Sequence, residues 1–144
     1  MRDSERLESL KAGTLSAFSV MFTYSFNVIG NSLVLAKQFE LFALLQIDTL
    51  FGLLVKVAIA FLSGFLFGVT YRYVIREDDN KHLKDGVVLA FALVRGLAPT
   101  EVESNLAFCL LALLSIESIL CFTIARLTLD WAIRIHWLKP FKSN

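Results

Sequence analysis

The sequence predicts an all-α membrane protein, a single-domain bundle of four transmembrane helices with both termini on the cytoplasmic side. Of its 144 residues, 56% are apolar and the mean hydropathy is +0.65. Soluble domains contain about 45–50% apolar residues. The apolar residues gather into long stretches with almost no charge. The basic residues fall in segments that four crossings would place on one side of the bilayer.

The first predicted span covers residues 12–36, which contain no charged side chain. Roughly 20 apolar residues suffice to cross a bilayer core. Thr23, Asn27 and Asn31 recur at every fourth position and therefore lie on one helix face. The preceding residues 2–8 mix both charge signs, which argues against a cleavable signal peptide, so this span is expected to be retained.

Residues 37–48 alternate between apolar and polar and suit a loop or a short helix in the membrane interface. The second predicted span, 50–74, contains one charge, Lys56. Gly64 and Gly68 share a four-residue stripe with this lysine and form a G-x-x-x-G step, which allows another helix to approach closely. Packing within the chain is a simpler interpretation of that step than dimerisation.

The third apolar segment, residues 86–98, is short and holds Arg95. At about 1.5 Å per residue it is about 20 Å long. It either crosses a locally thinned bilayer or enters and returns.

The last predicted span, 105–125, contains Glu117. An amphipathic extension over 126–138 is expected to lie on the membrane surface. In it, Arg126, Asp130 and Arg134 have the spacing of an ion-pair ladder.

The distribution of charge decides between these alternatives for the third segment. If it crosses, the basic residues of the N-terminal tail, of the segment between the second and third spans, and of the C-terminal tail share one side. Lys37 alone then lies opposite. If it does not cross, the C-terminal basic residues move to the other side and the bias weakens. The positive-inside rule therefore favours four spans.

Lys56, Arg95 and Glu117 are the charges at membrane depth, and Asn27 and Asn31 of the first span lie at a depth similar to that of Lys56. Such residues usually face the bundle interior, form pairs or line a path. We expect a polar partner for Glu117, with Lys56 as first choice, Arg95 as a second charged candidate and the two asparagines as hydrogen-bonding alternatives. We expect Arg95 to extend towards Glu101 or Glu103. A structural role in helix packing, an ion or substrate pathway, and a pigment or lipid contact all remain open.

Catalytic and metal signatures are missing from the sequence. It has no H-E-x-x-H, G-x-S-x-G, phosphate-binding loop or dinucleotide fingerprint, so we do not expect an enzyme. His82 and His136 stand alone outside the spans, and the acidic residues 77–79 with Asp85 suit a solvated loop. No metal or cofactor is therefore expected.

Cys109 and Cys121 lie in one apolar stretch and are interpreted as buried apolar fillers that do not pair. A net charge of +1 gives no field that would attract nucleic acid. The expected partners are the lipid bilayer and other integral membrane proteins.

The block from Tyr71 to Gly96, YRYVIREDDNKHLKDGVVLAFALVRG, resembles a block of small uncharacterised membrane proteins of cyanobacteria and plastids. It covers about a fifth of the chain. The resemblance implies the thylakoid or plasma membrane of an oxygenic phototroph and assigns no site residues. The sequence thus favours a non-catalytic accessory or assembly protein, conceivably for photosynthetic complexes. The alternative is a small transporter or channel using Lys56 and Glu117.

Overall fold

The chain is all-helical, as predicted. The computed structural model describes residues 2–35, 50–75, 80–98 and 105–141. These contain four α-helices: α1 (Arg2–Gly30), α3 (Leu50–Val74), α4 (Lys81–Leu97) and α5 (Asn105–Arg134). A π-helical turn, η1 (Asn31–Leu35), follows α1 directly. Three helical segments are long and apolar enough to cross a membrane: Asp3–Leu33, Leu50–Val74 and Phe108–Arg134.

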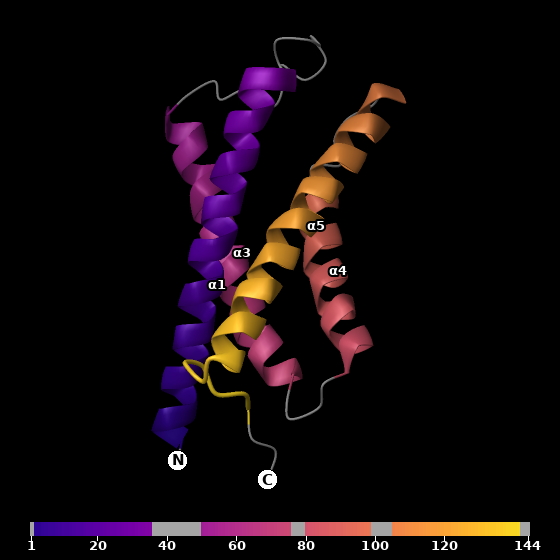
Figure 1. Cartoon of the computed structure of the whole chain (residues 1–144). Coiled ribbons are helices and arrows are strands. Elements are labelled where there is room, and N and C mark those ends of the chain that lie inside the picture. The colour runs from indigo at the N-terminus through magenta and orange to yellow at the C-terminus, as the bar shows by residue number, and fades with distance from the viewer. Residues whose placement is uncertain (1, 36–49, 76–79, 99–104, 142–144) are drawn as a thin grey trace.

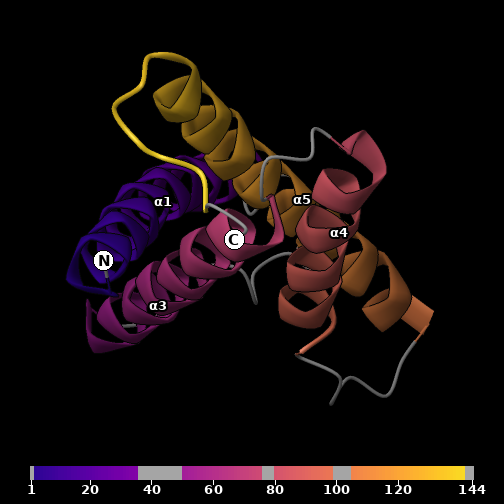
Figure 2. The ribbon, with the colours of Figure 1, turned by 90° about the horizontal axis from the view of Figure 1, so that it is seen from below.

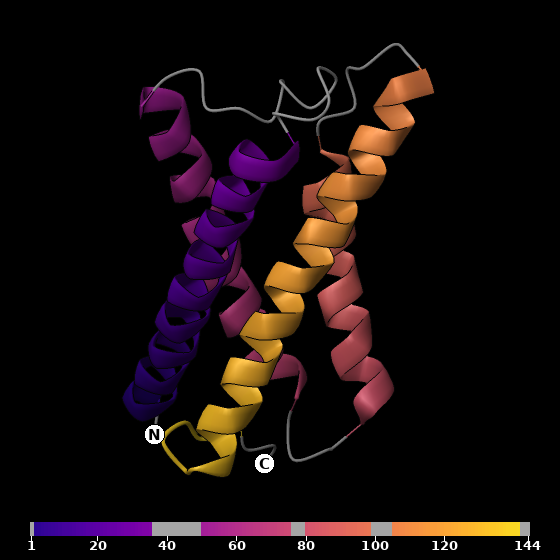
Figure 3. The same cartoon turned by 45° about the horizontal axis from the view of Figure 1, so that its top comes forward.

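The helices alternate in direction, so that α1 is antiparallel to α3 and α4 is antiparallel to α5 (Figure 1). Viewed from below, these pairs lie next to each other, with α5 crossing beside α1 (Figure 2). The two pairs diverge towards the end opposite the termini (Figure 3). The N-terminus, the C-terminal tail, the last turn of α3 and the first turn of α4 therefore share one end, which we call the terminal end.

The second predicted span agrees with α3 residue for residue, whereas α1 and α4 begin earlier than predicted. α1 starts at Arg2, ahead of the apolar run, because its charged first turns pack against the end of α3 and the C-terminal tail. α4 starts at Lys81, because the Asn80 side chain accepts a hydrogen bond of 3.1 Å from the backbone N–H of His82. α4 runs as one continuous helix along α5 and does not turn back (Figure 1).

The last predicted span runs on as one helix into the amphipathic extension predicted over 126–138. α5 continues without a break to Arg134, and Leu129 and Ala132 are buried against the bundle. Arg126 does contact Asp130 at 3.7 Å, but Arg134 is exposed and forms no ion pair with described residues.

The small-residue step packs α3 against α1, as the simpler interpretation predicted. A Cβ atom on Gly64 would lie 2.9 Å from Cα of Ala17, and one on Gly68 would lie 2.6 Å from Cβ of Ser16. Lys56 belongs to the same four-residue stripe, but its side chain is exposed. A helix turns by about 100° per residue, so positions repeated every four residues drift by about 40° per step. Between Lys56 and Gly68 the stripe has therefore moved about a third of the way around the axis of α3.

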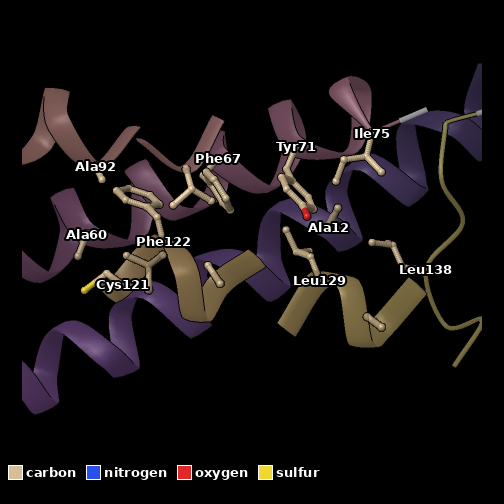
Figure 4. Close-up of a cluster of buried hydrophobic side chains, with 14 residues drawn as sticks. Ala12, Ala60, Phe67, Tyr71, Ile75, Ala92, Cys121, Phe122, Leu129 and Leu138 are labelled. Carbon is tan, nitrogen blue, oxygen red and sulfur yellow. The ribbon is translucent and has the colours of Figure 1, made fainter. Parts of the chain in front are cut away.

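The apolar core lies between the two pairs, and its centre is aromatic (Figure 4). Phe67 of α3 packs on Phe91 of α4 and on Phe122 of α5, with ring centroids 5.5 Å and 5.1 Å apart. Ala60 and Ala92 flank these rings and leave room for them. The core thus fixes the rotation of three helices and, with it, which side chains point inwards.

Candidate functional site

Glu117 is half-buried on α5 and accepts a hydrogen bond from the side-chain amide of Asn31. Asn31 is the first residue of η1, where the helix widens from α to π. The expectation of a polar partner is therefore confirmed, but the partner is Asn31, one of the two hydrogen-bonding alternatives, and not Lys56. This hydrogen bond ties the end of α1 to the middle of α5.

Arg95 points into the bundle, whereas Glu101 and Glu103, towards which it was expected to extend, lie outside the described residues. Its Nη1 donates a hydrogen bond of 2.8 Å to Oγ of Ser63 on α3. Its guanidinium lies over the ring of Tyr24 on α1, 4.9 Å from the centroid. A cation over an aromatic face is stabilised by the ring quadrupole, more strongly where water is excluded. Arg95 thereby connects α4 to both helices of the other pair.

Asn27 completes the group, because its side-chain amide donates to Sγ of Cys121 at 3.4 Å. The interior cluster, as we name it, contains one or more residues from each α-helix, with the Asn31 turn added: Tyr24, Asn27, Asn31, Ser63, Arg95, Glu117 and Cys121. It lies in the half of the bundle remote from the termini. Hydrogen bonding within hydrocarbon holds helices together because unpaired polar groups there are costly.

Lys56 is outside the interior cluster. Its side chain is exposed on α3 and pairs with none of the described carboxylates. The predicted Lys56–Glu117 pair is therefore not formed. The hydrophobic residues around it, Leu54, Val55 and Ile59, are exposed too, because α3 diverges from its neighbours there.

The chemistry open to the interior cluster follows from how its charges are held. Arg95 and Glu117 have opposite signs, yet each is bound by neutral groups, and they form no direct ion pair in the described structure. A carboxylate bound by an amide can exchange a proton without breaking a salt bridge. The cluster can therefore serve as a structural tie or as a protonatable relay.

A second polar centre, at the terminal end, was missed from the sequence. Arg72 of α3 is 1% exposed. It donates from Nη1 to Oγ of Ser9 at 2.6 Å and from Nε to the carbonyl of Lys139 at 3.0 Å, and it pairs with the Glu5 carboxylate. Flanked by Tyr71 and Tyr73, Arg72 had the sequence signature of an interfacial cation. Only its contacts with both ends of the chain show its role.

The terminal end holds a further network between α3, α4 and α5. The Tyr71 hydroxyl donates to Oδ1 of Asp130 at 2.8 Å, and Lys84 lies 3.7 Å from the same atom. Arg126 pairs with Asp85, and its hydrogen bond holds the pKa of the Asp85 carboxyl below the usual value. Asp85 was predicted to be a solvated loop residue, but it lies in the first turns of α4 and joins this network.

The two cysteines differ in their surroundings. Cys121 is buried, as predicted, whereas Cys109 is exposed on the outer surface of α5. Both thiols are free, as expected. The predictions for residues 37–48 and for acidic residues 77–79 lie outside the described residues.

Comparisons of the chain with protein-family models, with curated proteins and with solved structures find no match.

Proposed function

We propose that the chain is a non-catalytic integral membrane protein that associates with other integral membrane proteins. The observation that supports this proposal is Lys56, a charged side chain exposed on the apolar surface of α3. It lies about 9 Å along the axis from the start of the helix. Burying a charge in hydrocarbon costs roughly 2.5–3.5 kcal/mol at the centre of a membrane helix on insertion scales, and less towards its ends, where Lys56 lies. A carboxylate on a partner helix would remove much of that cost.

The surroundings of Lys56 suit a helix–helix contact. Exposed hydrophobic residues cover the first turns of α3, namely Leu50, Phe51, Leu54, Val55 and Ile59. They form a broad apolar surface around a single cation, so a partner with one acidic residue in an apolar helix would complement it. The competing explanation is that the Lys56 ammonium extends to lipid headgroups.

A photo-crosslinking experiment separates the two explanations. A photoreactive residue at Val55 in native membranes should capture the same membrane protein repeatedly, and the adduct should disappear in Lys56→Leu but persist in Lys56→Arg. Leu62→Ala, another exposed position on α3, is the matched control. An adduct that survives Lys56→Leu, or capture of lipid alone, would overturn the proposal. The resemblance of the 71–96 block makes thylakoid and plasma membranes of an oxygenic phototroph the first membranes to test.

The proposed topology has four spans, with both termini on the cytoplasmic side. It is supported by the shared location of the termini at one end and by the direction of α4 (Figure 1). α4 has 17 residues. At about 1.5 Å per residue it is about 26 Å long, slightly short of a core of about 30 Å. Reporters fused after Asn144 and inserted at Asn80 should read cytoplasmic, and one inserted between α4 and α5 should read outside. A cytoplasmic reading from the third would refute the four-span arrangement.

A second candidate function is transport of a proton or small ion through the bundle. The observation that favours it is the separate binding of Arg95 and Glu117 by neutral groups in the interior cluster. Lys56 has no part in it, because its side chain is exposed outside the bundle. In proteoliposomes, Glu117→Gln should abolish a flux that the parent chain supports while leaving its melting temperature nearly unchanged. A flux that is absent from the parent chain, or equal in both proteins, removes this candidate.

A further inference from the structure

At the terminal end, most of the described carboxylates have ion-pair or hydrogen-bond partners, whereas several basic side chains have no ion-pair partner among the described residues. Of the described carboxylates there, Glu5 pairs with Arg72, Glu8 with Lys11 and Asp85 with Arg126. Asp130 is bonded by Tyr71 and contacted by two basic side chains. The negative charge of these groups is therefore largely neutralised within the bundle.

Several basic side chains at the same end are exposed and form no ion pair with described residues. They are Arg6, Lys81, Arg134 and Lys139, against one similarly placed carboxylate, Asp3. This comparison covers residues 3–11, 80–85 and 126–141. Within these ranges the charge left for an outside partner is positive.

Arg134 and Lys139 stand beside the chain's two tryptophans. Trp131 is 63% exposed and Trp137 is 53% exposed. Leu127, Trp131 and Ile135 follow one another at four-residue spacing on the exposed face of α5. We call Leu127, Trp131, Arg134, Ile135, Trp137 and Lys139 the α5-end patch. Apolar and indole groups next to basic ones are typical of segments at the membrane–water interface.

The α5-end patch is held by the backbone. The Lys139 N–H donates to the Glu8 carboxylate at 3.1 Å, and the Lys139 carbonyl accepts from Arg72. The preceding residue, Leu138, is buried in the apolar core. The lysine side chain is thus exposed on a fixed backbone, and less conformational entropy is lost when it binds.

We propose that the α5-end patch binds anionic lipid headgroups. The guanidinium of Arg134 matches the geometry of a phosphate, and the Lys139 ammonium supplies a second cation. The indoles would sit at the level of the headgroups, with Leu127, one turn deeper on α5 than Trp131, directed towards the acyl chains. The proposal goes beyond association with membrane proteins and shares with it only the insertion of the chain into a bilayer.

The two tryptophans are the only ones in the chain and serve as native probes. The full chain is reconstituted in phosphatidylcholine, and part of the lipid is replaced by brominated phosphatidylglycerol or, at equal mole fraction, by brominated phosphatidylcholine. Bromine quenches indole fluorescence on contact. Stronger quenching by the brominated phosphatidylglycerol, reduced by high salt, is the expected result.

The variants give the decisive comparison. Arg134→Gln with Lys139→Gln should lower the apparent affinity for phosphatidylglycerol roughly fivefold for each cation removed. Quenching by brominated phosphatidylcholine should not change, because it reports insertion alone. Lys81→Gln, which removes an exposed cation of the same end outside the α5-end patch, is the control. Equal quenching by both lipids in the parent chain, or a preference that persists in the double variant, would overturn the proposal. Loss of quenching by both lipids would instead refute insertion.

Discussion

Nη1 of Arg72 donates a hydrogen bond of 2.6 Å to Oγ of Ser9, a residue 63 positions earlier in the chain. The same guanidinium binds the backbone carbonyl of Glu5 and that of Lys139. One buried side chain near the end of α3 thus joins the first turns of α1 to the C-terminal tail. Its burial is tolerable because each of its three nitrogens has a hydrogen-bond partner.

Replacing Arg72 should therefore destabilise the whole bundle. We expect Arg72→Leu to lower the free energy of unfolding by about 3 kcal/mol, since it leaves Glu5 and Ser9 without their hydrogen-bond partner. Arg72→Lys should recover only part of this loss, because an ammonium cannot reach three acceptors as a planar guanidinium does. Reversible unfolding in mild detergent, followed by circular dichroism, measures the difference. Arg6→Gln is the control, and equal stability of the Arg6 and Arg72 variants would contradict the assignment.

The contact between α1 and α3 should not accept a side chain at the glycines. Gly64→Leu and Gly68→Leu are each expected to cost about 1–3 kcal/mol or more, because the added atoms overlap the α1 backbone. Leu66→Ala on the exposed face should change the melting temperature little. Thermal unfolding in detergent compares the three. Unchanged melting of both glycine variants would show that α1 and α3 do not pack there.

The partner of Glu117 can be tested by a double-mutant cycle. Glu117→Leu should cost about 1–3 kcal/mol, because it leaves the Asn31 amide without an acceptor, whereas Glu117→Gln should cost less. Losses from Asn31→Leu and Glu117→Leu should be non-additive. Losses from Lys56→Leu and Glu117→Leu should add, because these side chains do not meet. The reverse pattern would restore Lys56 as the partner.

The Asp85–Arg126 pair predicts a pH dependence. The hydrogen bond from Arg126 holds the pKa of Asp85 below its usual 3.8, so the folded state favours the ionised carboxyl. The contribution of the ionised Asp85 carboxyl to the stability of the fold is fully present above the unfolded-state pKa. It is lost as the pH falls through the lower folded-state pKa. The melting temperature of the parent chain should thus drop more than that of Asp85→Asn when the pH is lowered below about 4. Parallel pH profiles would contradict this prediction.

The backbone at the end of α5 predicts that the stability of the fold depends on the shape of the side chain at position 136. His136 has a φ of 58°, and the N–H groups of His136 and Trp137 bond the carbonyls of Ile133 and Ala132. This is a Schellman cap with histidine where glycine is usual. His136→Val should lower stability by about 1 kcal/mol, since β-branched residues resist the left-handed region. His136→Gly should be neutral or better. Equal melting of the Val and Gly variants would show that the cap contributes nothing.

The apolar segments were readable from the sequence because the cost of placing a residue in hydrocarbon depends mainly on its own chemistry. Residues 50–74 therefore match α3 at both ends. The same reasoning located Lys56, Arg95 and Glu117 at span depth. It could not predict whether these three side chains point into the bundle or away from it. A helix turns by about 100° per residue, so a stripe of positions four residues apart drifts around the helix with distance.

The tertiary structure decided which way these side chains point from their helices. The close approach of α1 and α3 at the glycines and the packing of Phe67 on Phe91 and Phe122 set the rotation of the helices. That rotation turns Arg95 inwards and leaves Lys56 outside. The sequence by itself determined which segments are apolar and where charges fall along them. The partners of Arg72, Glu117 and Arg95 depended on residues 32 to 86 positions away. Contacts across such separations exist only after the helices have packed, so local composition does not reveal them.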